Sequence, residues 1–180
     1  MARREANKPD SLVQPVLTAM MAALIFVCSF VLKIPMANGY ANLGDLAVFM
    51  AAALLGNPWA AIAAALGSGL ADFMAGYTVY IPATLIIKGA MALLTASLAK
   101  KGKLVPFMLG TFLSGAVMCG GYFVWELYIY REGDTLGLGP ALSGLIPMNL
   151  VQAAVCVVFS WLMFRPVLSL RIRLLPSSTT

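Results

Sequence analysis

Residues 58–99 read PWAAIAAALGSGLADFMAGYTVYIPATLIIKGAMALLTASLA, two long apolar runs that break near Gly76 and carry only two charged residues, Asp72 and Lys88. Helices of about 20 such residues span the hydrocarbon core of a membrane. A charged side chain at the centre of such a helix costs at least ~2.5–3.5 kcal/mol, so we expect both charges to face a bundle interior or a wet cavity. The stretch therefore predicts two neighbouring transmembrane helices.

The rest of the 180-residue chain has the same character, with 61% hydrophobic and 11% charged residues. This composition predicts an all-α integral membrane protein without room for a folded soluble domain. Small residues at every fourth position of 58–76 predict that this helix is central and closely packed. Six transmembrane helices are expected, at residues 12–32, 43–56, 58–76, 81–99, 104–129 and 141–165.

Lysine and arginine residues predict the orientation. They cluster before the first helix, between the fourth and fifth, and after the sixth, whereas the opposite side holds only Lys33 and Arg131. By the positive-inside rule, the N- and C-termini are cytoplasmic. We expect a cytoplasmic tail at 1–11, a single six-helix substrate-binding domain at 12–165 and a cytoplasmic tail at 166–180, all in a multi-pass protein of the bacterial cell membrane. The cytoplasmic basic residues are Arg3, Arg4, Lys8, Lys100, Lys101, Lys103, Arg165, Arg171 and Arg173.

Polar residues of five helices fall in the outer half of this arrangement. With a rise of about 1.5 Å per residue, Asp45 lies near the outer rim and Lys88 lies about 10 Å deep. Each residue alone could be an internal brace; Asp72, for example, could pair with Lys88. Their clustering on one side instead favours an outward-facing binding cavity. The candidate substrate-binding residues are Asp45, Asp72, Thr84, Lys88, Glu126, Asn149 and Gln152, with the aromatic residues Tyr40 and Trp125.

The sequence lacks the residues that several classes of function require. The chain has no histidine, so histidine bases and histidine metal ligands are excluded. It also has no phosphate-binding loop of the kind that hydrolyses ATP, so energy for transport would come from a partner or an ion gradient. We expect no catalytic residues, no metal and no cofactor. An ion-coupled secondary carrier and a small membrane enzyme acting on a lipid-soluble substrate remain the alternatives.

Four segments carry a resemblance to a known family. They are YANLGD at 40–45, LGSGLADFMAGY at 66–77, PATLIIKG at 82–89 and PMNLVQ at 147–152. In this order the segments resemble the substrate-binding S components of energy-coupling-factor (ECF) vitamin transporters, in the riboflavin-type branch. The resemblance covers nearly the whole chain and agrees with its length.

The resemblance implies a membrane-embedded subunit that captures a vitamin from outside. It would work with a separate transmembrane coupling subunit and two cytoplasmic ATPase subunits, and deliver the vitamin by tilting of the whole bundle. Ala19 and Ala23 would contact the coupling subunit, and the loop from about Lys33 to Asn42 would cover the ligand. Lys88 and Asn149 match positions that can contact the ligand in this family. The resemblance does not decide which vitamin is bound. The two candidates are a small B vitamin or precursor, such as hydroxymethylpyrimidine, and riboflavin.

Overall fold

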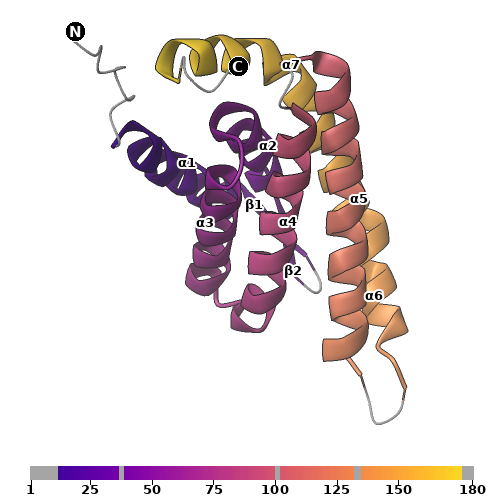
Figure 1. Cartoon of the computed structure of the whole chain (residues 1–180). Helices are drawn as coiled ribbons and strands as arrows, with labels where there is room; N and C mark the ends of the chain where they lie inside the picture. The colour runs from indigo at the N-terminus through magenta and orange to yellow at the C-terminus, as the bar shows by residue number, and fades with distance from the viewer. Residues whose placement is uncertain (1–11, 37–38, 100–101, 132–134, 176–180) are drawn as a thin grey trace, which may run out of the picture.

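The computed structural model describes residues 12–36, 39–99, 102–131 and 135–175. Within these ranges the elements of secondary structure are helices, joined by short turns, and one antiparallel β-hairpin (Figure 1). The 3-10 helix η1 precedes α4, and the π-helix η2 connects α6 to α7. The elements are α1 (Val13–Phe30), β1 (Lys33–Met36), β2 (Gly39–Asn42), α2 (Gly44–Leu55), α3 (Trp59–Ala75), η1 (Thr78–Tyr80), α4 (Ile81–Ala99), α5 (Leu104–Ile129), α6 (Leu138–Gly144), η2 (Leu145–Asn149) and α7 (Leu150–Leu174).

Helix α2 lies at the centre of the bundle and is buried along almost its whole length. It packs against α1, α3, α4 and α7, while α5 packs against α4 and α7. Val48 and Phe49 in its middle are completely shielded from solvent. The core is therefore built around a short helix that the longer helices enclose.

Four helical segments are long and apolar enough to cross a membrane: α1, Thr78–Ala99, α5 and α7. The shorter apolar helices α2 and α3 occupy two more of the predicted segments. With 12 residues, α2 is about 18 Å long, well short of a hydrocarbon core of about 30 Å. The six-span count and the cytoplasmic position of both termini remain predictions.

The sixth predicted segment differs most from its expected form. It contains α6, η2 and α7, and α7 continues past residue 165 to Leu174, with Pro166 inside the helix. The predicted tail at 166–180 thus begins within a helix. In Figure 1 the last part of α7 runs across the end of the bundle at which α1 begins.

Two side chains bind the C-terminal end of α2 at this end of the bundle. The Nη1 of Arg171 in α7 donates to the carbonyl of Ala53 (3.1 Å), and the Nε2 of Gln14 in α1 donates to the carbonyl of Leu55 (3.0 Å). The last carbonyls of a helix have no partner within the helix, so these bonds satisfy them. Arg171, one of the basic residues predicted on the cytoplasmic side, is consequently buried.

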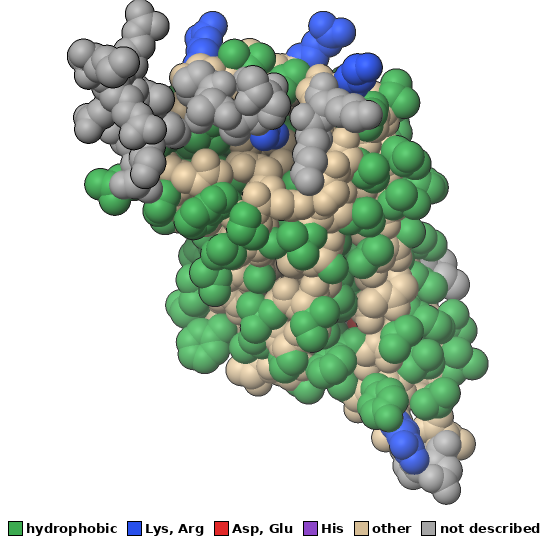
Figure 2. Space-filling model, in the orientation of Figure 1, with side chains coloured by type: hydrophobic (Ala, Val, Ile, Leu, Met, Phe, Trp, Pro, Cys, Tyr) green, Lys and Arg blue, Asp and Glu red, His purple; other side chains and the backbone are tan. Residues whose placement is uncertain are grey.

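The other basic residues described by the structure are distributed unevenly. Figure 2 shows Lys and Arg side chains gathered at the end of the bundle covered by α7, and one further group at the opposite end. Arg3, Arg4, Lys8, Lys100 and Lys101, on which the predicted orientation also depends, lie outside the described residues.

Gly67 allows α3 to approach α1 closely. A Cβ atom at this position would lie 2.5 Å from the carbonyl oxygen of Ala22 and 2.9 Å from the Cβ of Ile25. We expect Gly67→Ala to lower the Tm of the detergent-purified protein, because overpacking of this kind costs about 1–3 kcal/mol. Gly120→Ala is the control, since nothing lies within 4 Å of the corresponding Cβ. Equal Tm values for the two variants would contradict this close contact.

Candidate functional site

A buried ion pair joins α2 to α4. The Nζ of Lys88 contacts the Oδ1 of Asp45, and their side chains are 5% and 1% exposed. Asp45 lies in the first turn of α2, where the helix dipole favours a negative charge. Two charges that would each be costly alone in an apolar bundle therefore neutralise one another.

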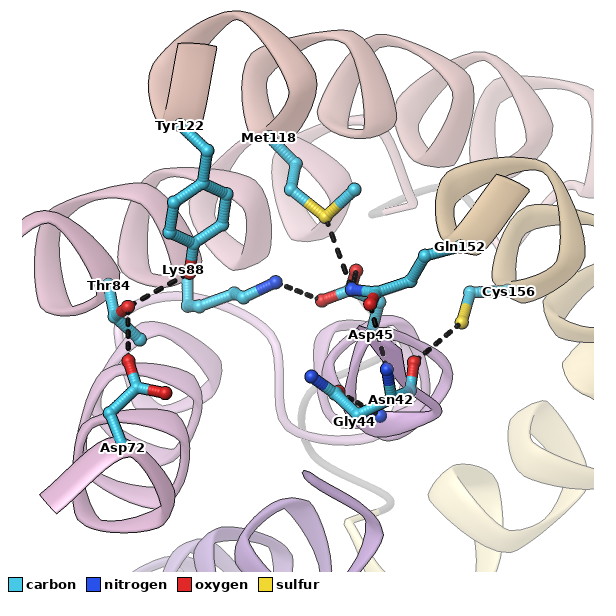
Figure 3. Close-up of polar contacts among 10 residues, drawn as sticks. All are labelled: Asn42, Gly44, Asp45, Asp72, Thr84, Lys88, Met118, Tyr122, Gln152 and Cys156. Carbon is cyan, nitrogen blue, oxygen red and sulfur yellow. Dashed lines mark hydrogen bonds and ion pairs between the residues drawn. The ribbon is translucent and has the colours of Figure 1, made fainter. Parts of the chain in front are cut away.

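Gln152 of α7 connects this ion pair to the hairpin (Figure 3). Its Nε2 donates to the Oδ2 of Asp45 (2.6 Å), and its Oε1 accepts a bond from the backbone N–H of Asn42 (2.8 Å), at the end of β2. Both functional atoms of the carboxamide thus have strong partners. We call Asn42, Asp45, Lys88 and Gln152 the central network; it links α2, α4, α7 and the hairpin.

A second set of polar contacts lies beside the central network. The hydroxyl of Thr84 donates to the Oδ2 of Asp72 (2.5 Å) and lies 2.9 Å from the hydroxyl of Tyr122. The Nζ of Lys88 lies 5.3 Å from the centre of the Tyr122 ring, within cation–π range. Asp72, one possible partner of Lys88, instead bonds Thr84, whereas Asp45 pairs with the lysine.

Glu126 forms a third cluster near the end of α5. The hydroxyl of Tyr80 donates to its Oε1 (3.3 Å) and lies 3.1 Å from the hydroxyl of Tyr130. Glu126 is only 5% exposed, and among the described residues its Oε2 has no hydrogen-bond partner. A Cβ atom on Gly144 of α6 would lie 2.9 Å from the Oε1, so a glycine lets α6 pack directly against this carboxylate.

The remaining predicted site residues lie apart from these clusters. Asn149 is the last residue of η2 and is half-buried, and Trp125 lines an apolar groove between α4 and α5. The backbone of Tyr40 belongs to β2, but its side chain lies outside the described part of the structure. Ala19 and Ala23 are both exposed on α1. The structure therefore brings together Asp45, Asp72, Thr84, Lys88 and Gln152.

The pairing of Asp45 with Lys88 was not expected from their predicted depths. Counting along the helices placed Asp45 at the outer rim, well above Lys88, yet the two side chains are paired and Asp45 is almost completely buried. The reason is that α2 is short and follows a hairpin, so that the start of α2 does not mark the edge of the bundle. Helix boundaries alone could not reveal this.

Sequence reasoning did not include Asn42, Tyr80, Tyr122 and Tyr130 among the site residues. Helical spacing carries a signal for two of them. Tyr80 precedes Thr84 by four residues and Tyr122 precedes Glu126 by four, so each tyrosine shares a helix face with a predicted site residue. The contact of Asn42 involves its backbone N–H, which no side-chain pattern reports.

The described interior holds more acids than bases. Three acids are buried, Asp45, Asp72 and Glu126, against two bases, Lys88 and Arg171. Of the two bases, Arg171 binds the C-terminal end of α2, away from the central network. Carboxylates, hydroxyls and a carboxamide can accept several hydrogen bonds from a polar ligand, and the tyrosines can pack on a ring. In the ranges that the structure describes, no group of three or more Cys, Asp or Glu is placed to hold a metal ion.

Removing one member of the ion pair should destabilise the fold. Lys88→Met leaves Asp45 buried without its counter-charge, a change that typically costs about 3–5 kcal/mol. We expect a marked loss of Tm for Lys88→Met and for Asp45→Asn, and partial recovery in the double variant. Lys103→Met, at an exposed lysine, serves as the control. Additive losses in the double variant would argue against the pairing.

Comparisons with known proteins bear on the family of this chain. The family model described as ECF-type riboflavin transporter, S component, matches residues 10–167. The thiamine precursor transporter HmpT of Lactococcus lactis subsp. cremoris (strain MG1363) is 32% identical over 147 residues, which are 80% of this chain and 81% of HmpT. A Pyrococcus woesei protein described as an uncharacterized protein in a gap 3′ region is 32% identical over 124 residues, covering 64% of this chain and 81% of that protein.

These matches confirm the resemblance seen in the sequence. The family is one of transporter subunits rather than enzymes, and it is membrane-embedded, in keeping with the apolar helices of this chain. The family and the HmpT relative together support a role in vitamin transport. The chain belongs to the family of ECF-type riboflavin transporter S components.

Proposed function

We propose that this chain captures a small B-vitamin-like heterocycle, of the thiamine-precursor class, in an outward-facing cavity and delivers it inward. The observation that carries the proposal is the convergence of buried polar side chains from α2, α3, α4 and α7 around the Lys88–Asp45 pair. Charged groups inside a membrane bundle are characteristic of substrate pathways. The name of the HmpT relative, a thiamine precursor transporter, supports this class of ligand.

The chemistry of the cluster favours a ligand that donates hydrogen bonds. Asp45 and Asp72 supply carboxylate acceptors, and charge-assisted bonds to such groups are the stronger kind. An aminopyrimidine carries N–H donors for the carboxylates and ring nitrogens that can accept from Lys88 or Asn149. Its flat ring suits the neighbouring Tyr122. Thr84 and Gln152 would complete the site, with Glu126, Trp125 and Tyr40 toward its mouth.

Riboflavin is the second candidate, because the matched family is described by that vitamin. Its ring system also presents adjacent donors and acceptors, but it is much larger than a pyrimidine. The two ligands are therefore to be compared directly in binding measurements.

Transport also requires partners. The proposed partners are a transmembrane coupling subunit, contacted through the exposed Ala19 and Ala23 of α1, and two ATPase subunits. In this mechanism the segment from Lys33 to Asn42 covers the ligand, and the bundle tilts as a unit to open the cavity toward the cytoplasm. The bond between Asn42 and Gln152 supports a link between that segment and the site.

Ligand binding should depend on Asn149 without a loss of stability. We expect mass spectrometry of molecules released from the denatured protein to detect a stoichiometric thiamine precursor, and calorimetry to show tighter binding of hydroxymethylpyrimidine than of riboflavin. Asn149→Ala should weaken binding at least about tenfold, the effect of losing one good polar contact, with an unchanged Tm. Asn57→Ala, at the opposite end of the bundle, should bind like the wild type.

The reverse order of affinities would support riboflavin. Absence of binding across a vitamin panel would contradict the proposal. Uptake by cells without the ATPase subunits would instead favour an ion-coupled secondary carrier, and turnover of a substrate by the purified chain would favour a small membrane enzyme.

The coupling contact can be tested separately from binding. Leucine at Ala19 and Ala23 adds bulk to a small, exposed helix face, so we expect the double variant to lose co-purification with the coupling subunit while keeping its vitamin affinity. Ala116→Leu, an exposed alanine on α5, is the matched control. Unchanged assembly of the Ala19→Leu/Ala23→Leu variant would exclude this face as the contact.

A further inference from the structure

The hydroxyl of Ser68 is a buried polar group without a partner. Ser68 lies in α3 and is only 4% exposed, and within the described residues its Oγ makes no hydrogen bond. Buried hydroxyls in folded proteins are normally bonded, because a polar group that loses water without a replacement destabilises the fold. Two other buried serines follow this rule: Ser114 donates to the carbonyl of Met91, and Ser160 donates to the carbonyl of Val157. The hydroxyl of Ser68 is therefore a candidate for contact with a ligand.

The packing of α3 against α4 places Ser68 level with Lys88. The two helices are joined by a short turn and run antiparallel, side by side in Figure 1. The bond between Thr84 and Asp72 fixes their register. Four residues further into the bundle along each helix, which is about one turn, lie Lys88 on α4 and Ser68 on α3.

A contact on the deeper side supports this register. A Cβ atom on Gly89 would lie 3.9 Å from the Cβ of Ala65, so the two helices keep the same alignment past Ser68 and Lys88. Both of these residues are buried. The ammonium of Lys88 carries three N–H donors, and within the described ranges one of them is bonded, to the Oδ1 of Asp45. A strong donor and a hydroxyl thus lie at one level of the bundle, beside the central network.

We propose that Ser68 and Lys88 together bind a hydroxyl group of the ligand, which makes Ser68 a further specificity-determining residue. A ligand hydroxyl accepts a hydrogen bond from the ammonium and donates one to the Oγ of Ser68, so it satisfies both groups. A methyl group in its place would leave the Oγ unpaired, and a site built to bond a hydroxyl strongly rejects analogues that lack it. This inference rests on the proposed capture of a thiamine precursor and selects the precursors that carry a hydroxyl.

Two matched ligands test the assignment on the full-length protein in detergent. They are hydroxymethylpyrimidine and the analogue with a methyl group in place of its hydroxymethyl group, compared by calorimetry. We expect the wild type to bind the hydroxymethyl form at least about tenfold more tightly. Ser68→Ala should weaken binding of this form about tenfold, because one hydrogen bond is lost, and should leave the affinity for the methyl analogue unchanged.

Thermal stability distinguishes a ligand contact from a structural one. Ser68→Ala removes a hydroxyl that has no partner in the described fold, so its Tm should equal or exceed that of the wild type. Ser114→Ala is the matched control, since it removes a buried hydroxyl that bonds Met91 and Thr95 of α4. We expect this control to have a lower Tm and to keep the wild-type preference between the two pyrimidines.

Three results would overturn the inference while leaving the proposed function intact. They are equal affinities of the wild type for the two pyrimidines, an unchanged preference in Ser68→Ala, and a lower Tm for Ser68→Ala, which would make the hydroxyl a structural brace. Failure of the proposed function has a different signature, because the wild type would then bind neither pyrimidine, and the inference would fall with it.

Discussion

The ion pair between Lys88 and Asp45 is the constraint on which the polar interior depends. In a low-dielectric bundle neither charge is tolerable alone, so α2 and α4 are held at the one separation and rotation that brings the two groups together. Gln152 extends this constraint to α7, and its bond with Asn42 extends it to the hairpin. Interactions of this kind specify geometry more sharply than apolar packing between smooth helices does.

The same arrangement bears on selectivity. Asp45 already accepts bonds from an ammonium and a carboxamide, so a ligand that competes for it has to offer donors of comparable strength. An apolar molecule that displaced Lys88 or Gln152 from Asp45 would leave the carboxylate without compensation. Discrimination by unsatisfied buried polar groups is generally stronger than discrimination by size.

The sequence predicts some elements of this fold closely and others poorly. The segments 81–99 and 104–129 match α4 and α5 residue for residue, because long apolar runs end at clear polar or glycine-rich boundaries. The hairpin was expected only as a loop, since its pairing depends on two four-residue strands with no long pattern. Likewise, composition indicated that Lys88 needs an acid, but only the three-dimensional packing of α2 selects Asp45 over Asp72.

Helix α2 is secured at both ends. Asp45 is bound near its start, while Arg171 and Gln14 hold carbonyls in its last turn. Sliding α2 along its axis would break strong bonds at one end or the other. Helix α2 is therefore fixed along its axis relative to α1, α4 and α7. In the proposed transport mechanism, this favours movement of these helices together as one body over sliding of α2 alone.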